Sequence, residues 1–248
     1  MRTLFYVPVI HSSADLGSIA KDVAERGVAN LGQDLWERHR RTVEGFWNVI
    51  SNYFDSIDVK GVKIYQDGMV GEDEVGKKIV EDTAKAGSKN YQLVSRILER
   101  GAVLVKTEDF KLVKKEYERL LAITQAGSII QKIIAFIRYK AAKAVLLNKR
   151  DAFIAKKIDE TLGRDEKGIL FIGAFHKIKK KLAKSIQVRE VKDTGKVRMY
   201  QRLLPFQDKC RKQFDELSEY LVSEVSETTG NNTHNLGSGH RVRKHEWF

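Results

Sequence analysis

The hydrophobic pattern of the N-terminal half alternates between short apolar runs and longer amphipathic stretches. The runs are rich in β-branched and aromatic residues and are bounded by turn residues, which is typical of buried strands. They occupy residues 3–10, 61–66 and 102–106. Between them, apolar residues recur at helical spacing, which predicts amphipathic helices. These helices cover residues 33–56, 72–85 and 89–100.

The C-terminal half continues this alternation. A fourth apolar run, Ile169–Gly173, predicts a buried strand, and the weaker run 185–191 predicts a fifth. Strands that alternate with helices favour a parallel sheet covered by helices. We therefore expect an α/β fold with a largely parallel or mixed sheet flanked by helices. The remaining helical patterns cover residues 109–123, 128–147, 151–162 and 206–227.

Residues 1–227 predict a single α/β domain, with residues 110–148 as a helical insertion packed over the mouth of a pocket. The apolar residues of the insertion exceed one narrow stripe, so they predict either burial on two sides or a homo-oligomer contact. Ser12, Ser13 and Asp15 offer caps for a helix after the first strand. Residues 228–248, rich in Gly, Asn and Ser before a basic and aromatic end, predict a flexible basic tail.

Composition narrows the class of protein. With 42% hydrophobic and 31% charged residues, the chain is a folded protein and not a disordered one. No apolar stretch approaches the roughly 20 residues of a membrane span. The first residues lack the cleavage region of a secretory signal, so we expect a cytoplasmic protein. A single cysteine, Cys210, excludes an internal disulfide framework and a cysteine-rich metal site.

The net charge of +12 is compatible with three partners: nucleic acid, an anionic membrane surface or an anionic substrate. A platform for stacked bases needs aromatic residues among its basic ones. The densest basic run, 176–184, has none between its lysines. Lysines also spread along the whole chain, which favours an ordinary solvated surface. A nucleic-acid partner therefore stays an alternative that rests on charge alone.

Polar residues with catalytic chemistry follow four of the predicted strands: His11, Asp67, Glu108 and His176. In an open α/β sheet, ligands bind outside the carboxyl ends of the strands. Imidazole and carboxylate groups gathered there suit zinc, manganese or cobalt, or a general base. Gly173 would let a ligand approach the end of the fourth strand closely. The alternative is that each histidine is simply hydrogen-bonded and that acids after strands, such as Asp109, cap the next helix.

Residues 173–176 (Gly-Ala-Phe-His), which end an apolar strand, resemble the C-terminal G-x-x-H motif of the TraB/PrgY/TIKI group. This group is related to erythromycin esterases and ChaN-like proteins. Residues 149–155 are similar to the group's Arg-Asp/Asn helix start and lie one helix before that strand. Residues 8–11 stand where the group has its first G-x-x-H, with Pro8 in place of Gly, and Asp67 stands where it usually has Glu. The resemblance covers residues 1–190 in layout.

The resemblance implies a hydrolase-like pocket, because members of the group carry out metal-dependent peptide cleavage or metal-free ester hydrolysis. It implies that His11 and His176 are metal ligands or a general base, and that Asp67 and Glu108 are further ligands or orient a histidine. Arg150 would neutralise an oxyanion or an anionic group; otherwise it forms a surface salt bridge, and Asp151 caps its helix. The expected cofactor is a divalent metal (Mn, Co or Zn), and the expected substrate is a peptide, an ester or another small molecule. The alternative, implied by ChaN-like relatives, is a non-catalytic module that binds a small ligand or haem.

Overall fold

The structure, a computed structural model, describes residues 1–12, 15, 25, 27–29, 31–124 and 129–226, without the side chains of 120–121, 123–124 and 129–141. Its sheet has five strands in the order β3-β2-β4-β1-β5, and each pair of neighbours is parallel. The predicted α/β fold is therefore confirmed, and the sheet of the described residues is parallel throughout. The strands are β1 (Arg2–Val9), β2 (Lys63–Gln66), β3 (Val103–Val105), β4 (Lys167–Gly173) and β5 (Ile186–Glu190).

The helices follow the predicted order with two differences. The predicted helices over 128–147 and 151–162 form one helix of 33 residues, α6, and a helix that the sequence did not predict, α7, follows β5. Most of the segment after the first strand, where a helix is expected, lies outside the described residues, and so does the tail expected over 228–248. The helices are α2 (Gln33–Asp55), α3 (Asp73–Lys85), α4 (Lys89–Glu99), α5 (Phe110–Thr124), α6 (Ile129–Thr161), α7 (Thr194–Leu203) and α8 (Arg211–Val222), with short 3-10 turns η2 (Ile178–Lys180) and η3 (Leu204–Lys209).

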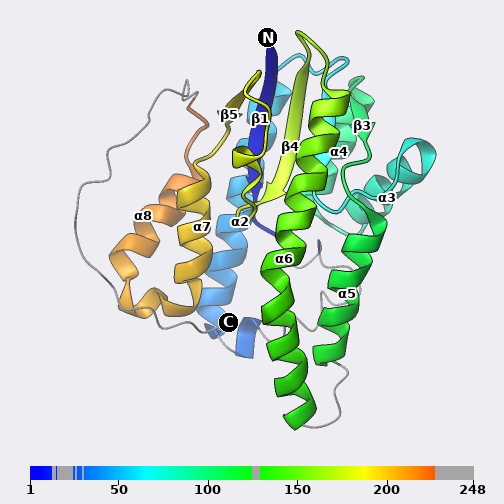
Figure 1. Cartoon of the computed structure of the whole chain (residues 1–248). Helices are drawn as coiled ribbons and strands as arrows, with labels where there is room; N and C mark the ends of the chain where they lie inside the picture. Colours follow the sequence, from blue (N-terminus) through cyan, green and yellow to red (C-terminus); the bar gives the residue numbers. More distant parts are fainter. Residues whose placement is uncertain (13–14, 16–24, 26, 30, 125–128, 227–248) are drawn as a thin grey trace.

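Helices cover both faces of the sheet (Figure 1). In β1, Phe5, Val7 and Val9 face a core shared with α2, α4, α7 and α8, whereas Leu4 and Tyr6 face a second core shared with α6 and η2. This alternation follows from the two-residue period of a strand. Among the described residues, no helix is both long and apolar enough to cross a bilayer.

Pro8 lies inside β1, a strand with a neighbour on each side. On the β5 side the paired residues end at Tyr6, whose carbonyl accepts a hydrogen bond from the amide of Val191. Even-numbered residues of β1 therefore turn their backbone groups toward β5, and Pro8 comes beyond the end of that ladder. Its missing N–H costs no strand hydrogen bond, because no residue of β5 is paired with Pro8 on that side.

The chain leaves the neighbouring strands β1 and β4 in opposite directions. After β1 it reaches α2 and then β2, and after β4 it crosses the other face through η2 to reach β5. In α/β proteins, ligands bind at such a divergence, outside the carboxyl ends of the two strands. In Figure 1, α5 and α6 extend together beyond this edge of the sheet, which is where the predicted insertion would lie.

Candidate active site

Arg150 gathers three carboxylates at the carboxyl edge of the sheet. Its Nε donates to Oε1 of Glu108 at 3.0 Å, and its Nη2 donates to Oδ1 of Asp67 at 2.6 Å and also to Glu108. Its Nη1 donates to Oε2 of Glu116 on α5 at 2.6 Å. Asp67 follows β2, Glu108 follows β3 and Arg150 lies within α6. One buried guanidinium thus joins two strand ends to the helices above them, in the fixed planar geometry that suits carboxylates.

His176 lies beside this cluster, between two more carboxylate contacts. Its Nδ1 is 2.5 Å from Oδ1 of Asp151, and its Nε2 is 3.4 Å from Oδ2 of Asp67. The other oxygen of Asp151 accepts a hydrogen bond from the amide of Lys177 at 2.9 Å. Asp151 therefore fixes both the ring of His176 and the backbone immediately after it. The contact with Asp67 exceeds hydrogen-bond length, so that side of the imidazole is held less tightly.

The turn after β4 brings His176 and Asp67 together. The amide of His176 donates to the carbonyl of Gly173, and the amide of Gly173 donates to Oδ2 of Asp67 at 3.1 Å. A Cβ on Gly173 would stand 3.3 Å from Oδ2 of Asp67 and 3.4 Å from Cδ2 of His176. The glycine therefore leaves room for the carboxylate and the imidazole, which is the close approach that the sequence predicted for this position.

Burial and neighbouring charges shift the pKa values of His176, Glu108 and Asp67 by different amounts. Burial alone would lower the pKa of His176, but its contacts with Asp151 and Asp67 raise it to about 9. Burial raises the pKa of Glu108 to about 7, against the opposing effect of Arg150. Burial also tends to raise the pKa of Asp67, but the contact with His176 and the charge of Arg150 hold it well below its usual range. At neutral pH, His176 and Arg150 are cationic, Asp67 is ionised and Glu108 is close to its midpoint.

His11, the second predicted histidine, is not bonded to this cluster. Its side chain is 46% exposed, and its Nδ1 lies 4.0 Å from Oδ2 of Asp15. The charge of His11 is nevertheless one of the causes that lower the pKa of Asp67. The bonds of Asp67 and His176 go to Arg150 and Asp151 of α6. Of the predicted site residues, the structure brings Asp67, Glu108, Arg150 and His176 together and leaves His11 outside their contacts.

Two residues of the cluster, Asp151 and Glu116, were not predicted from the sequence. The expectation that Asp151 caps a helix is wrong, because α6 is continuous through this position and its carboxylate binds His176. The expectation that Arg150 forms a surface salt bridge is also wrong, because Arg150 is buried. The similarity of residues 149–155 to the TraB/PrgY/TIKI motif was the signal that could have found Asp151. The sequence contains no comparable signal for Glu116.

Among the described residues, no group of three or more His, Cys, Asp and Glu side chains is spaced to hold a metal ion. Asp67 and Glu108 instead turn oxygens toward Arg150, so the acids present do not form a ready set of metal ligands. A cation could use these oxygens only if the guanidinium released them. The divalent metal therefore stays a prediction.

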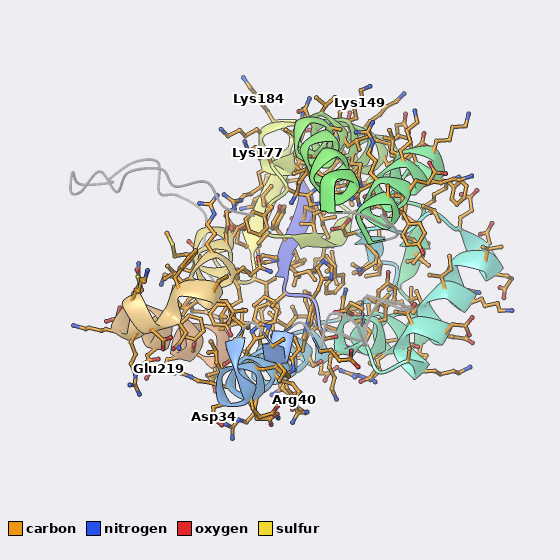
Figure 2. All side chains as sticks on the ribbon, turned by 90° about the horizontal axis from the view of Figure 1, so that it is seen from below. Asp34, Arg40, Lys149, Lys177, Lys184 and Glu219 are labelled. Atoms are coloured by element: carbon orange, nitrogen blue, oxygen red, sulfur yellow. The ribbon has the colours of Figure 1, made fainter. Side chains whose placement is uncertain are left out.

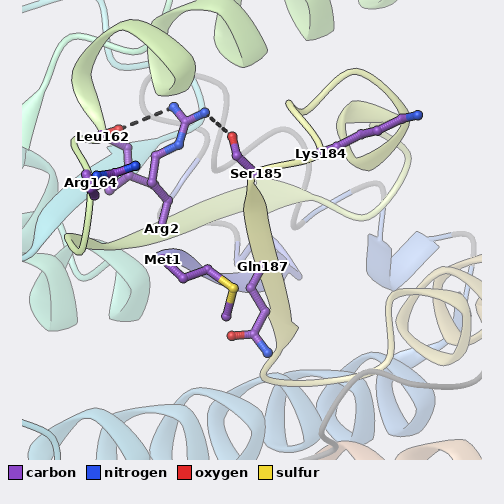
Figure 3. Close-up of a pocket in the computed structure, with 7 residues that line it drawn as sticks. All are labelled: Met1, Arg2, Leu162, Arg164, Lys184, Ser185 and Gln187. Atoms are coloured by element: carbon purple, nitrogen blue, oxygen red, sulfur yellow. Dashed lines mark hydrogen bonds between the residues drawn. The ribbon is translucent and has the colours of Figure 1, made fainter.

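A large cavity lies elsewhere, at the amino ends of β1 and β5 (Figure 3). It measures about 790 Å³ and is open and basic, with Arg2, Arg164 and Lys184 in its wall. Arg2 is already bonded to the carbonyl of Leu162 and to Oγ of Ser185. Because ligands of parallel sheets bind at the opposite edge, we do not place the candidate active site here.

Comparison with protein-family models, with curated proteins and with solved structures gives no match for this chain, so its function has to be argued from its own residues.

Proposed function

We propose that the chain is a hydrolase whose catalytic centre is the cluster formed by His176, Asp67, Glu108 and Arg150. The observation that supports the proposal is the pairing of two buried titratable groups with separated pKa values beside a buried guanidinium, at the carboxyl edge of a parallel sheet. Such a pair is typical of acid and base roles in one centre. The resemblance of residues 149–155 and 173–176 to hydrolases of the TraB/PrgY/TIKI group points in the same direction.

Glu108 is the candidate general base. Its Oε1 accepts from Arg150, while its buried Oε2 has no hydrogen-bond partner among the described residues. An unpartnered buried carboxylate oxygen is costly unless water or a ligand binds it. With a pKa near 7, Glu108 can take a proton from a water bound at Oε2 at neutral pH.

His176 is the candidate general acid, because its pKa of about 9 keeps the imidazole protonated at neutral pH. It would give a proton to the leaving group from its loosely held Nε2. Arg150 makes four contacts with the three carboxylates, which use four of the five N–H groups of a guanidinium. The remaining N–H on Nη1 can stabilise the charge that develops on a carbonyl oxygen.

The test is a panel of an activated ester, a fluorogenic peptide and a phosphodiester, each assayed with EDTA and with Mn²⁺, Co²⁺ or Zn²⁺. We expect kcat/KM on one of them to rise with pH through about 7 and to fall through about 9. In the pH profile of kcat/KM, Glu108→Gln should remove the acidic limb and His176→Gln should remove the alkaline limb. Each variant should lower kcat/KM by about 10²–10⁴-fold. His11→Ala, which removes no hydrogen bond of the cluster but removes a charge that acts on Asp67, is the comparison variant and should cost less than about tenfold in kcat/KM.

Absence of hydrolysis of all three substrates by the wild type would refute the proposal. Full activity of both Glu108→Gln and His176→Gln would refute the proposal that this cluster is the catalytic centre. A control variant as damaged as these two would show that His11 takes part in the chemistry after all.

A further inference from the structure

Helix α7 brings two polar side chains to the carboxyl ends of β1 and β4. Nε of Arg198 donates to the carbonyl of Ala174 at 2.8 Å. Nε2 of Gln201 lies 3.5 Å from the carbonyl of Val9. Val9 and Gly173 are the last paired residues of the two strands, and Ala174 follows directly. Both side chains therefore reach the point where the chain leaves these strands in opposite directions, which is where α/β proteins bind ligands.

The guanidinium of Arg198 is only partly used. The side chain is half-buried, and Nη1 and Nη2 have no hydrogen-bond or ion-pair partner among the described residues. Glu190, the acid at the end of β5, is instead paired with Lys179. Arg202, one turn further along α7, lies over the ring of Phe175 at 5.8 Å. Arg198 is therefore the arginine of α7 whose charge is left for a ligand, in a fixed planar geometry that suits a carboxylate.

A second observation at the same place also indicates a missing ligand. Oε1 of Gln201 is buried and has no hydrogen-bond partner among the described residues. A buried oxygen without a donor is costly, and it is expected where a bound molecule supplies the donor. Gln201 and Arg198 are three residues apart on one helix and are therefore neighbours on its surface. A carboxylate for Arg198 beside an N–H for Gln201 is what the end of a peptide offers, whereas a phosphate brings only further acceptors.

This pair of side chains adjoins the proposed catalytic centre. Arg198 binds the turn over residues 173–176, whose last residue is His176, the candidate general acid. Figure 2 looks onto this edge from the carboxyl ends of the strands and shows Lys177, the residue after His176, on the side of α6. A general acid gives its proton to the leaving group. A charged group held by Arg198 therefore belongs to the leaving part of the substrate.

We propose that Arg198 determines specificity and that the substrate is a peptide with a free terminal carboxylate, which Arg198 binds while Gln201 accepts a neighbouring N–H. This inference rests on the proposed hydrolytic centre and names its substrate class. In the reaction, a water gives a proton to Glu108 and its oxygen to the acyl carbon. The C–N bond then breaks, and the leaving amine takes a proton from His176.

The probes are acetyl-Ala-Ala-Ala with a free carboxylate and the same peptide as its C-terminal amide. Binding is measured by calorimetry on the full chain carrying Glu108→Gln, which lacks the candidate base. We expect the acid to bind with a Kd of about 1 mM or tighter. The amide, which lacks the charge, should bind about tenfold more weakly. In the wild type, hydrolysis should favour the acid by a similar factor, through KM and not through kcat.

Variants of α7 locate the preference. Arg198→Met should weaken binding of the acid about tenfold, to the level of the amide, whereas Arg198→Lys, which keeps the charge, should retain part of the preference. Gln201→Leu should weaken the acid and the amide alike. Arg202→Gln removes the same charge from the same helix and is the matched control, so it should leave the preference unchanged. Thermal unfolding checks that each variant folds.

The inference is overturned if the acid and the amide bind equally, if the preference survives Arg198→Met, or if Arg202→Gln abolishes it to the same extent. A preference for the acid without hydrolysis of either peptide would refute the hydrolase and support the carboxylate site. Hydrolysis of both peptides with equal KM would support the hydrolase and refute the carboxylate site.

Discussion

At the scale of single residues, the cluster depends on contacts that one methyl group would disturb. Gly173 faces both Asp67 and His176 at distances that leave no room for a relaxed Cβ. Asp151 holds His176 on its tighter side. These two residues do not need to touch a substrate to control the centre, because they set the position and the charge of the groups that would.

Gly173→Ala should push the carboxylate of Asp67 away from the imidazole. We expect a loss of about 1–3 kcal/mol of unfolding free energy and a fall of the His176 pKa from about 9. Urea unfolding and an NMR titration of the histidine ring protons measure the two effects. Gly163→Ala is the matched control, since its Cβ would also meet a carboxylate, that of Glu166 at 3.1 Å, but far from the centre. It should leave the His176 pKa unchanged; a shift there would contradict the local explanation.

Asp151→Asn should change how stability depends on pH. The pKa of His176 is raised from 6.5 to about 9, so the folded state binds its proton more tightly than the unfolded state. The resulting stabilisation, on the order of 3 kcal/mol, is complete below pH 6.5 and is lost as the pH rises through about 9. Without the carboxylate charge of Asp151, a large part of this contribution disappears, and the part supplied by Asp67 remains.

The measurement is urea unfolding of both proteins at several pH values between about 6 and 10. The difference between wild type and variant should be large at the acidic end and small at the alkaline end. Groups that titrate in both proteins, such as Glu108, largely cancel in this difference. A difference that does not vary with pH would show that Asp151 acts only through packing or through its bond to the amide of Lys177.

At the scale of elements, α6 supplies neighbouring residues to both halves of the centre: Arg150 binds the acids after β2 and β3, and Asp151 binds His176 after β4. Further along the same helix, Ile154 and Ile158 pack in the core below. Glu116 of α5 also bonds Arg150, so the two helices beyond the sheet edge are connected at the centre.

Arg150→Met should destabilise the chain by about 3–5 kcal/mol, because it leaves buried carboxylates without their cation. It should also raise the pKa of Glu108 further, since the hydrogen bond and the charge of Arg150 are the main causes that lower it. Chemical unfolding at pH 6 and pH 9 measures both effects, as the loss should be greater where Glu108 is ionised. Lys156→Met on the same helix removes an exposed ion pair with Glu160 and should cost less than about 1 kcal/mol. Equal losses of unfolding free energy for Arg150→Met and Lys156→Met would show that burial of the Arg150 ion pairs does not matter.

The sequence predicted most elements, because strands with buried faces and helices with one apolar stripe have clear periods. It failed at α6 for a reason connected with the site. Asn148, Lys149, Arg150 and Asp151 interrupt the apolar stripe and were interpreted as a boundary between two helices. No Gly or Pro stands there, and two of these polar residues are buried because they face a polar centre.

The candidate site could be predicted in part for a similar reason. Residues that directly follow strands, Asp67 and Glu108, are placed by the sheet itself, and His176 is placed by a short turn. His11 also follows a strand, but its side chain is 46% exposed and its nearest carboxylate contact is Asp15, which strand ends alone do not reveal. Glu116 reaches Arg150 only through the packing of α5 against α6, a tertiary contact that has no local signal.

At the scale of the whole molecule, Lys192 connects the end of the sheet to α8. It is buried, and its ammonium group donates to the carbonyls of Tyr220 and Ser223 at 3.0 and 2.5 Å, near the end of that helix. A cation there satisfies carbonyl groups that a helix leaves unpaired and complements the negative end of its dipole. This contact attaches the last described helix to the strand β5.

Lys192→Met should lower the unfolding free energy by about 1–3 kcal/mol, because the carbonyls lose their donor. Burial lowers the Lys192 pKa from 10.5 to about 8, so the wild type should gain some stability as the pH rises from about 8 to 10.5, and the variant should not. Unfolding curves at pH 7 and pH 10 measure this. Lys196→Met, which removes a cation from the ring of Tyr220 at 4.1 Å, is the neighbouring control. If Lys192→Met is as stable as the wild type at both pH values, Lys192 does not hold α8 to the end of β5.

The single long helix through the centre has a consequence for how this chain can change. Each residue added to an α-helix rotates the two parts of the helix on either side of it by about 100° relative to each other. An insertion after Asp151 would therefore swing the guanidinium and the carboxylate of α6 away from all their partners at once, whereas an insertion near the start of α6 would leave them in place. Length variation in this protein should be tolerated ahead of residue 150 and excluded between residue 151 and the core positions 154 and 158.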